Sequence, residues 1–578
     1  MLRRRGRKPA NGAPDAAAKV PPKQAPRAIP QASPTWTANV AALHACLNRK
    51  DSFGAADAAS HLTDDACTRA DRVAQTWLPV RIRGLFPRKV RSGTPDDQLW
   101  SYRDCAADFY CHLVIEGLLL APAHLPELRD TLARERAITA GVPTAMRLDT
   151  GKLADDDQGI FGAAEYLKDG LLSILERMGQ TEWLDRLHEV LSAVLHSLPV
   201  ETRYGRLPSQ DCETNGDLLQ TLSRLYHRER RPEYLTAGRA MADAYTREVL
   251  PNNGWILADD WDFAAGRSAG YQNLWLLDHG NESVSGLVEW TIAESVAPDS
   301  RREAYAPAIE HMLDTLLDRG RDTSGMWLRE TLPAGAPVPA PSPQPLNDTW
   351  GYLSAAYVAY ALTLPAGNPR RERYMGEARR ALQAASSLHR AAWQDGFFDG
   401  YADSIEGALY LLPYFDETEI ARWIDEETGV FLAYQREDGF VGRNYLDGNY
   451  IRTSLLYAMF RTGGTRVEPW EPGVRLGAVR SPQGLQLALS CDRPHSVRLV
   501  FDNVRHRDYL HLPFDYPRLN SWTEWFPIDR KTHYEVSSKR PDGAPSVHTY
   551  SGKKLLEGLP VDLRAEPLYL HVKHAVTA

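Results

Sequence analysis

A helical hairpin that repeats along most of the chain is the feature that most constrains this sequence. Leu218, Leu222 and Leu225 fall on one face of a predicted helix, and Pro232 opens a second helix that packs back against it. This αα-hairpin recurs at a period of roughly 50–70 residues, a length typical of stacked or closed repeat arrays. Leading helices are predicted to begin near residues 100, 158, 213, 279, 348, 402 and 448, and partner helices near 123, 181, 232, 300, 369 and 417.

The hairpins favour a closed ring over an open solenoid, because a ring tolerates long irregular loops and solenoid repeats are usually shorter and more uniform. Apolar residues alternate at 497–501 and again at 568–572, which predicts β-strands near the C-terminus. The sequence therefore predicts a mainly α protein with three parts. These are a disordered basic Pro/Ala-rich tail (1–35), an (α/α)6 toroid of helical hairpins (36–466) and a small β-rich C-terminal domain (467–578).

Composition and charge reduce the number of partner and cofactor classes that this protein could use. The net charge of −8 argues against a nucleic-acid partner. No apolar run approaches the roughly 20 residues of a membrane span, and the basic tail lacks the apolar core of a signal peptide, so we expect no membrane partner and favour the cytoplasm. The six cysteines form no CxxC or zinc-type spacing, and we expect free thiols and no metal. Nucleotide-binding and nucleophile-elbow motifs do not occur, so we expect no cofactor.

Acidic and amide residues gather where the leading helices begin. The clusters read DDDQG (155–159), DCETNGD (211–217), DHGNE (278–282), NDTWG (347–351), DGYADSIEG (399–407) and DGNYIR (447–452). In an α/α toroid the leading helices run the same way, so these clusters would meet at one mouth of the ring. Helix capping is the alternative explanation, and it accounts for Asp155, Asp447 and Asp399.

Capping does not account for acids inside the first turns of the leading helices. Small residues stand beside these acids at Gly216, Ser283 and Gly407, and we expect them to leave room for a ligand. Aromatic and polar residues cluster in the adjoining loops, and although each aromatic alone is explained by core packing, their repetition beside carboxylates favours sugar binding. The predicted substrate-binding residues are His279, Asn281, Trp255, Trp261, Trp327, Arg329, Trp350, Tyr401 and Arg443.

The hairpin repeat and these helix starts together resemble the six-hairpin glycosidase superfamily, which comprises α/α-toroid glycoside hydrolases and polysaccharide lyases. The segment GDLLQTLSRLYHRERRPEYLTAGRAMADAY is similar to helical pairs in such enzymes. GNESVSGLVEW resembles the GETCAS-type helix of the β-L-arabinofuranosidase family, but Ser283 replaces its cysteine and no partner cysteines follow. That family's zinc–thiolate chemistry is therefore not carried over. The resemblance implies a carbohydrate-acting enzyme and an inverting mechanism.

Glycoside hydrolysis needs one carboxyl group that donates a proton and another that activates water or attacks carbon. We assign the acid to Glu282, which lies one turn into its helix, and the base to Asp348 in the next hairpin, with Asp217 and Asp403 in reserve. A separation of roughly 6.5–9.5 Å between the two carboxyl groups would agree with inversion. The function predicted is a glycoside hydrolase acting on an oligo- or polysaccharide, of unassigned oligomeric state.

Three alternatives stay open at this point. A polysaccharide lyase acting on a uronic-acid glycan would use His279 with Tyr271 and a cation such as Arg329 or Arg443. A non-catalytic glycan-binding toroid would tolerate the loss of any one carboxylate, and a terpenoid-cyclase-like toroid lacks a DDxxD motif in a suitable helix. The loop DDWDF (259–263) has the oxygen-rich character of a calcium site, which two solvated acids explain equally well.

Overall fold

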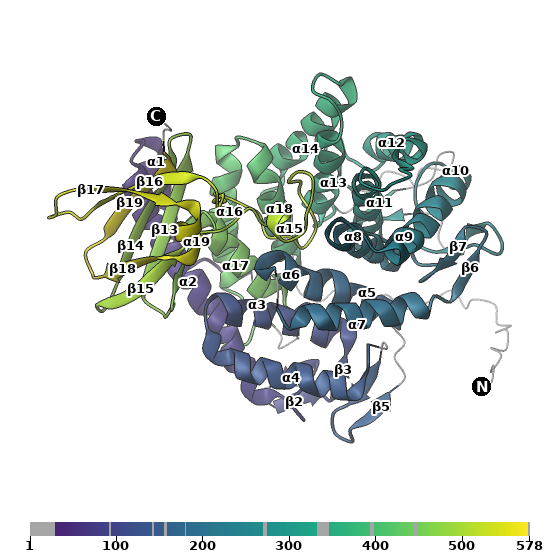
Figure 1. The fold of residues 1–578 in the computed structure, drawn as a ribbon, viewed down its shortest axis with the longest axis horizontal. Coiled ribbons are helices and arrows are strands. Elements are labelled where there is room, and N and C mark those ends of the chain that lie inside the picture. The colour runs from purple at the N-terminus through teal and green to yellow at the C-terminus, as the bar shows by residue number, and fades with distance from the viewer. Residues whose placement is uncertain are drawn as a thin grey trace.

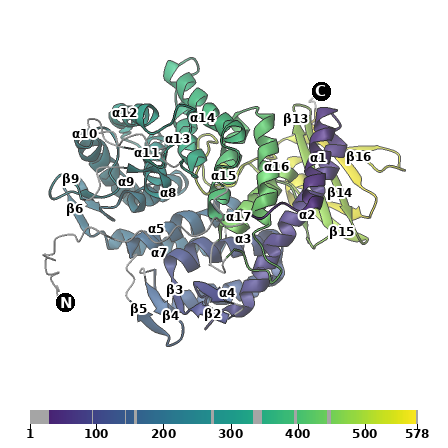
Figure 2. The same ribbon diagram turned by 180° about the vertical axis from the view of Figure 1, so that it is seen from behind.

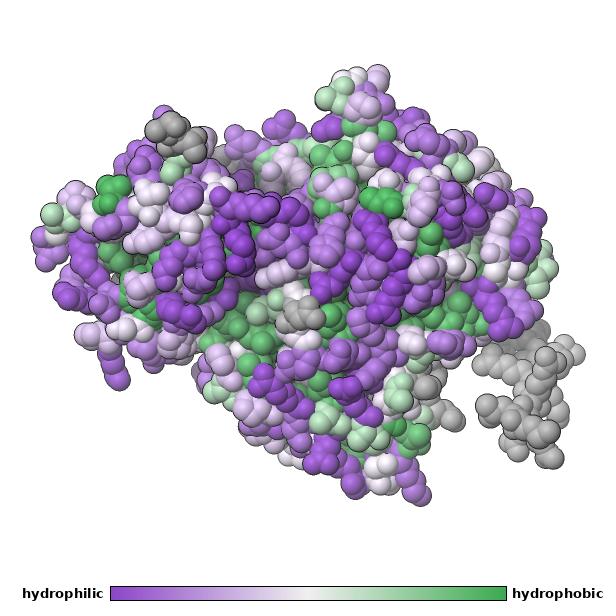
Figure 3. All heavy atoms as spheres, in the orientation of Figure 1, coloured by the Kyte–Doolittle hydropathy of each residue, from purple (hydrophilic) through white to green (hydrophobic). Residues whose placement is uncertain are grey.

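The computed structural model describes residues 29–575 apart from 92–93, 142–143, 155–158, 180, 270–273, 332–345, 394–397 and 443–447. Its helices form one large body, and the strands of the C-terminal residues form a smaller body beside it (Figure 1). Hydrophilic side chains dominate the face seen in Figure 3. No helix in the described part of the chain has the length and apolar character needed to cross a bilayer.

Inner helices form a closed ring. They are η2 with α3 (Tyr102–Tyr110, Cys111–Leu119), α5 with η4 and α6 (Ile160–Glu165, Tyr166–Leu171, Leu172–Met178), α8 (Cys212–Glu229), α11 (Asn281–Glu294), α13 (Trp350–Leu362), α15 (Phe398–Leu411) and α17 (Asn449–Thr462). Each contacts the next, from η2 against η4 through to α15 against α17, and the contact of α17 with α3 closes the ring.

Outer helices follow the inner ones and return along the outside of the ring. They are α4 (Leu125–Ile138), α7 (Trp183–His196), α9 (Pro232–Ala244), α12 (Arg302–Arg319), α14 (Pro369–Ser387) and α16 (Thr418–Leu432). The N-terminal helices α1 (Pro34–Asn48) and α2 (Ser52–Trp77) pack against α16 and α17 (Figure 2). The predicted toroid of helical hairpins is confirmed, and its helices begin within a few residues of the predicted positions.

Inner helices are buried on every side, which requires small residues where they cross. A Cβ atom on Gly216 would lie 2.5 Å from the backbone of Glu282, and one on Gly407 would lie 2.6 Å from the Cα of Gly351. The Ser283 hydroxyl donates hydrogen bonds to the carbonyls of Cys212 and His279. The expectation that Gly216, Ser283 and Gly407 leave room for a ligand is therefore wrong, because these residues let neighbouring backbones approach closely.

The C-terminal residues form two packed antiparallel sheets, which confirms the predicted β domain. One sheet has the order β13-β14-β19-β16-β17 (Val474–Ser481, Gly484–Cys491, Leu568–His574, His533–Lys539, Ser546–Ser551), and the other has the order β12-β15-β18 (Arg466–Glu468, His495–Val500, Leu559–Leu563). Apolar side chains of both sheets form one core between them. Strand β13 packs on α2 so closely that a Cβ on Gly477 would lie 2.1 Å from the carbonyl oxygen of Ala56.

Short elements occupy the loops. They are η1 (Leu78–Val80), η3 (Pro122–His124), η5 (Tyr245–Val249), η6 (Leu276–Gly280), η7 (Leu412–Tyr414), α10 (Leu250–Asn252), α18 (Arg505–Asp508), α19 (Gly552–Glu557), β1 (Lys89–Arg91), β2 (Thr94–Asp97), β3 (Leu99–Ser101), β4 (Ala145–Arg147), β5 (Lys152–Ala154), β6 (Val200–Thr202), β7 (Gly205–Leu207), β8 (Trp261–Asp262), β9 (Arg267–Ser268), β10 (Leu274–Trp275) and β11 (Glu330–Thr331). The six cysteines are unpaired, as expected.

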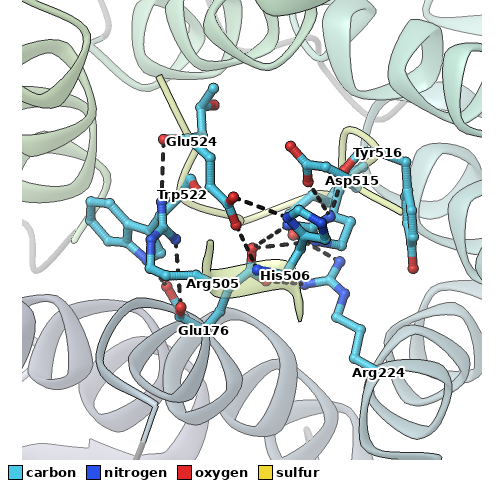
Figure 4. Close-up of polar contacts among 12 residues, drawn as sticks. Glu176, Arg224, Arg505, His506, Asp515, Tyr516, Trp522 and Glu524 are labelled. Atoms are coloured by element: carbon cyan, nitrogen blue, oxygen red, sulfur yellow. Dashed lines mark hydrogen bonds and ion pairs between the residues drawn. The ribbon is translucent and has the colours of Figure 1, made fainter. Parts of the chain in front are cut away.

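A segment of the C-terminal domain, residues 502–526, covers the end of the ring where the inner helices finish. In Figure 4 it lies between the surrounding helices, with α18 at its start. Arg518 forms a 2.8 Å ion pair with Glu176 of α6, and the indole of Trp522 donates a 2.9 Å hydrogen bond to Ser173. Arg224 of α8 donates to the carbonyl of Leu519. We call this segment the plug.

Candidate active site

The four predicted catalytic carboxylates lie at the other end of the ring, where the inner helices begin. Asp217 is in the second turn of α8, Glu282 is in the first turn of α11, Asp403 is in the second turn of α15, and Asp348 stands two residues before α13. They form two neighbouring pairs. The charge of Glu282 acts on Asp217, and the charge of Asp348 acts on Asp403.

Lys168 holds the first pair together. Its Nζ atom lies 2.8 Å from Asp169, 3.1 Å from Asp217 and 2.7 Å from Glu282, and its side chain is only 2% exposed. Burial alone would lower the pKa of Lys168, but the surrounding carboxylates raise it well above the ordinary value, so the lysine is charged. Gln220 donates a 2.6 Å hydrogen bond to Glu282. One cation thus serves three carboxyl groups.

Asp217 is the acid of this pair whose pKa is raised. It is 1% exposed, and burial raises its pKa well above the usual range, with the lysine opposing and Glu282 adding to the rise. Glu282, by contrast, receives both the lysine and the Gln220 amide.

Asp403 belongs to a second network that Glu406 anchors. The Tyr352 hydroxyl lies 3.0 Å from a carboxyl oxygen of each of the two acids. Glu406 is fully buried and accepts 2.9 Å hydrogen bonds from Arg452, which gives it the partner that a buried carboxylate needs. Asp403 itself is partly exposed. Withdrawal from bulk water raises its pKa well above the usual value, and the charges of Asp399, Asp348 and Glu406 raise it further.

Asp348 stands over the start of α15. A Cβ on Gly400 would lie 3.2 Å from its Oδ2 atom, and its backbone carbonyl accepts a hydrogen bond from Ser404. The carboxyl group is 21% exposed, and the Arg329 guanidinium lies 3.9 Å away. Arg329 also lies over the ring of Trp275. This acid therefore combines solvent access with a nearby cation.

Asp108 of η2 connects the two networks. Its carboxylate accepts a hydrogen bond from the backbone of Gly448, and its pKa is raised to about 7. Enclosure by the protein is the main cause of this rise, with Arg452 opposing and Asp399 and Asp169 adding to it. Since Asp169 sits beside Lys168 and the charge of Asp399 acts on Asp403, carboxyl groups from several inner helices gather at the end of the ring where these helices begin, which we call the opening.

His279 lies at the rim of this opening. It borders a cavity of about 380 Å³ whose walls include Phe161, Asp211 and Glu213. The imidazole is 3.4 Å from Asp211 and 3.5 Å from Glu213. Burial would lower the pKa of His279, but these acids raise it to about 9, so the ring carries a positive charge at neutral pH. Asp211 also caps α8, accepting from the backbone of Thr214.

The predicted aromatic residues pack within the helical body. Trp261, Trp327, Trp350 and Tyr401 are each no more than 2% exposed. Their partners are core residues: Trp261 donates to Glu248, Trp327 donates to Ser354, Trp350 stacks on Trp393 and Tyr401 packs on Tyr434. Trp255 stacks on His311 of the outer helix α12. These contacts place the five rings in the packing of the helical body.

The remaining predicted positions are Asn281, Arg443, Tyr271 and the DDWDF loop (259–263). Asn281 is 2% exposed at the start of α11. Arg443, together with Tyr271, lies outside the described residues. In the DDWDF loop, Asp259 accepts a hydrogen bond from the backbone of Trp275 and Asp262 accepts from the two residues that follow it by two and three positions. These acids therefore stabilise turns, which is the simpler explanation of the loop.

Sequence reasoning missed several residues of the opening. They are Lys168, Asp169, Asp108, Tyr352 and Arg452, and Glu406 lies in the DGYADSIEG cluster (399–407) without a predicted role. Lys168 and Asp108 lie in π-helical turns of inner helices, a deviation that is common at functional sites. Hydrophobic periodicity does not indicate such turns, so the sequence carries no direct signal for these positions.

Comparison with known proteins finds similarity in solved structures alone. No protein-family model and no curated protein matches the chain. The chain is similar to a GH76A alpha-1,6-mannanase from Salegentibacter sp. HEL1_6 (11% identity, 68% of this chain and 98% of that chain, TM-score 0.38). It is also similar to cellobiose 2-epimerase from Spirochaeta thermophila DSM 6192 (14% identity, 52% of this chain and 85% of that chain, TM-score 0.39). A third similar structure is an unsaturated glucuronyl hydrolase specific for heparin (13% identity, 69% of this chain and 95% of that chain, TM-score 0.39). The toroid itself rests on the helix contacts of this chain.

Proposed function

We propose that this protein is a glycoside hydrolase that cleaves an oligo- or polysaccharide at the opening of the helical ring. One observation carries the proposal: carboxyl groups from α8, α11, α15, η2, η4 and the loop before α13 gather at one end of the ring in unlike environments. Hydrolysis of a glycosidic bond requires such a division, with one carboxyl group protonated and another ionised.

We assign the proton donor to Asp403. Its raised pKa favours the protonated form, and its partial exposure lets the leaving oxygen reach it. Tyr352, fixed by Glu406, orients the carboxyl group through a 3.0 Å hydrogen bond. This assignment replaces Glu282, whose carboxyl group is held 2.7 Å from Lys168 and accepts a 2.6 Å hydrogen bond from Gln220.

Asp348 keeps the role of base that its sequence position suggested. It is exposed to the opening, it stands over the helix that carries Asp403, and Arg329 favours its ionised form. In the proposed step Asp348 removes a proton from water as the oxygen attacks the anomeric carbon. Asp403 gives its proton to the departing oxygen, so the bond breaks with inversion of configuration.

Asp217 and Glu282 then serve as positioning residues. With Lys168 they form a buried, hydrogen-bonded group at the base of the opening. His279 and Arg329 contribute positive charge at the rim, suited to sugar hydroxyl or carboxylate groups.

A screen of glycans with wild-type protein and two variants tests the proposal. Asp403→Asn and Asp348→Asn should each lower hydrolysis by about 100- to 10,000-fold while the far-ultraviolet circular dichroism stays unchanged. Asp314→Asn is the matched control, because Asp314 lies on the outer helix α12 in ion pairs with Arg370 and Arg373. Full activity in either of the first two variants would refute the assignment.

A polysaccharide lyase is the second candidate, and Arg329 at the opening favours it, since a guanidinium pairs with a uronate. The positive charge on His279 opposes the base role that this mechanism would give it. Proton nuclear magnetic resonance of the products separates the two functions. Hydrolysis with inversion gives a new anomer and no alkene, whereas lysis gives an unsaturated sugar.

A further inference from the structure

A second group of ionisable side chains lies away from the opening, where α2, α3 and η3 meet. His124 Nδ1 is 3.1 Å from Glu116 Oε2, and His124 Nε2 is 3.7 Å from Asp71 Oδ1. One nitrogen or oxygen atom from each of the three residues lies within 4.8 Å of the others. The side chains of Glu116, Asp71 and His124 are 0%, 7% and 15% exposed, so the group is buried with one edge open to solvent.

This group carries more negative charge than its protein neighbours balance. Two carboxyl groups share one imidazole, and among the described residues no lysine or arginine contacts either acid. Glu116 Oε1 is buried and has no hydrogen-bond partner within the part of the chain that the structure describes. A buried carboxylate oxygen without a donor is costly unless a ligand completes it.

Two comparable groups elsewhere in the described residues are satisfied by protein atoms. Asp211 in the group with Cys212 and His279 caps a helix and accepts from backbone amides. In the group of His506, Asp515 and Glu524, Arg518 pairs with Asp515, and both oxygens of Glu524 accept from His506 (Figure 4). Neither group leaves a buried carboxylate oxygen without a donor.

We propose that Asp71, Glu116 and His124 bind one divalent transition-metal ion of the zinc type. One imidazole nitrogen and two carboxylate oxygens are ligands that zinc accepts, at about 2.0–2.2 Å each. A nitrogen and an oxygen 3.1 Å apart can bind one such ion together with little movement. The ion would neutralise the excess charge and connect α2 to α3 and η3, which makes it a structural brace with a remaining coordination position for water.

Zinc binding to metal-free full-length protein tests the proposal. Isothermal titration of chelator-treated protein should show one tight zinc site per chain. Glu116→Gln and His124→Gln should each weaken binding about tenfold or more. His506→Gln is the matched control, because it removes a histidine from a comparable group, and it should bind zinc like the wild type. Binding that is absent, or equal in all four proteins, would overturn the proposal.

X-ray absorption at the zinc edge of the wild-type protein gives a reading that does not depend on variants folding. With one equivalent of zinc, the spectrum should show one imidazole, oxygen neighbours and no sulfur. Sulfur or a second imidazole in the first shell would place the ion in another group and overturn the assignment.

Discussion

At the scale of single residues, the charge balance of the opening depends on Lys168. This buried cation contacts Asp169, Asp217 and Glu282, so Lys168→Met leaves three carboxyl groups without a counter-ion. We expect a loss of about 3–5 kcal/mol in the free energy of unfolding, larger at pH 8 than at pH 5, because protonation relieves the repulsion. Urea denaturation at the two pH values measures it. Lys152→Met, an exposed change, is the control, and equal stability of the two variants would contradict the account.

The raised pKa of Glu116 predicts how the free energy of unfolding of the metal-free protein changes with pH. Its pKa rises from 4.5 to about 7 on folding, so the folded state binds the proton more tightly. The resulting stability is present below pH 4.5 and is lost as pH rises towards 7, by roughly 3 kcal/mol. His124, whose pKa is also raised, acts in the same direction.

The measurement for Glu116 is the urea midpoint of chelator-treated protein between pH 4.5 and 7.5. Glu116→Gln removes the titrating group and should flatten the fall seen in the wild type. Glu127→Gln, on an exposed side chain of α4, should keep the wild-type slope. A slope in Glu116→Gln as steep as in the wild type would show that other groups cause the pH dependence.

At the scale of helices, close crossings between neighbouring inner helices hold the opening together. In Gly216→Ala the new Cβ would meet the backbone of Glu282 at 2.5 Å, where no flexible side chain can move aside. We expect a loss of about 1–3 kcal/mol and reduced hydrolysis, since α8 and α11 must separate. Gly376→Ala in the outer helix α14 meets nothing within 4 Å and should stabilise by about 0.5–1 kcal/mol. Thermal unfolding compares them, and a neutral Gly216→Ala would contradict the packing described.

Helix starts were predictable because local chemistry marks them. Pro232 and Pro369 open outer helices, and Asp211 caps α8. The acids at those starts were predictable for the same reason. Lys168 was not, because only the folded ring brings α5, η4 and α6 beside α8 and α11. The packing of the loop aromatic residues was not predictable for a related reason. Trp327 fills a gap between helices, and the sequence pattern does not locate such gaps.

Two other features could not be predicted from the sequence, because they depend on contacts between residues far apart in the chain. The plug has no repeat or periodicity that would indicate its place at the far end of the ring. Asp71, Glu116 and His124 are separated by 45 and 8 positions in the chain, so no metal-binding spacing could reveal them. Their proximity depends on how α2, α3 and η3 meet in the folded protein.

At the scale of the whole molecule, the plug joins the C-terminal domain to the ring through buried charges. Arg518→Ala leaves Glu176, which is fully buried, without its 2.8 Å partner. We expect a loss of about 3–5 kcal/mol. Arg498→Ala removes an arginine that is 59% exposed and paired with Glu468, and should change stability by less than about 1 kcal/mol. Urea denaturation of both variants checks this, and equal effects would mean that the plug contributes little to the fold.

The central claim is that a glycan binds where the inner helices begin. Hydrogen–deuterium exchange of Asp403→Asn, with and without the glycan found in the screen, tests it most directly, because this variant should bind without turnover. The account predicts slower exchange in peptides containing the starts of η4, α8, α11 and α15, and no change in the outer helices α12 and α14. Slower exchange confined to the outer helices or the C-terminal sheets would contradict it.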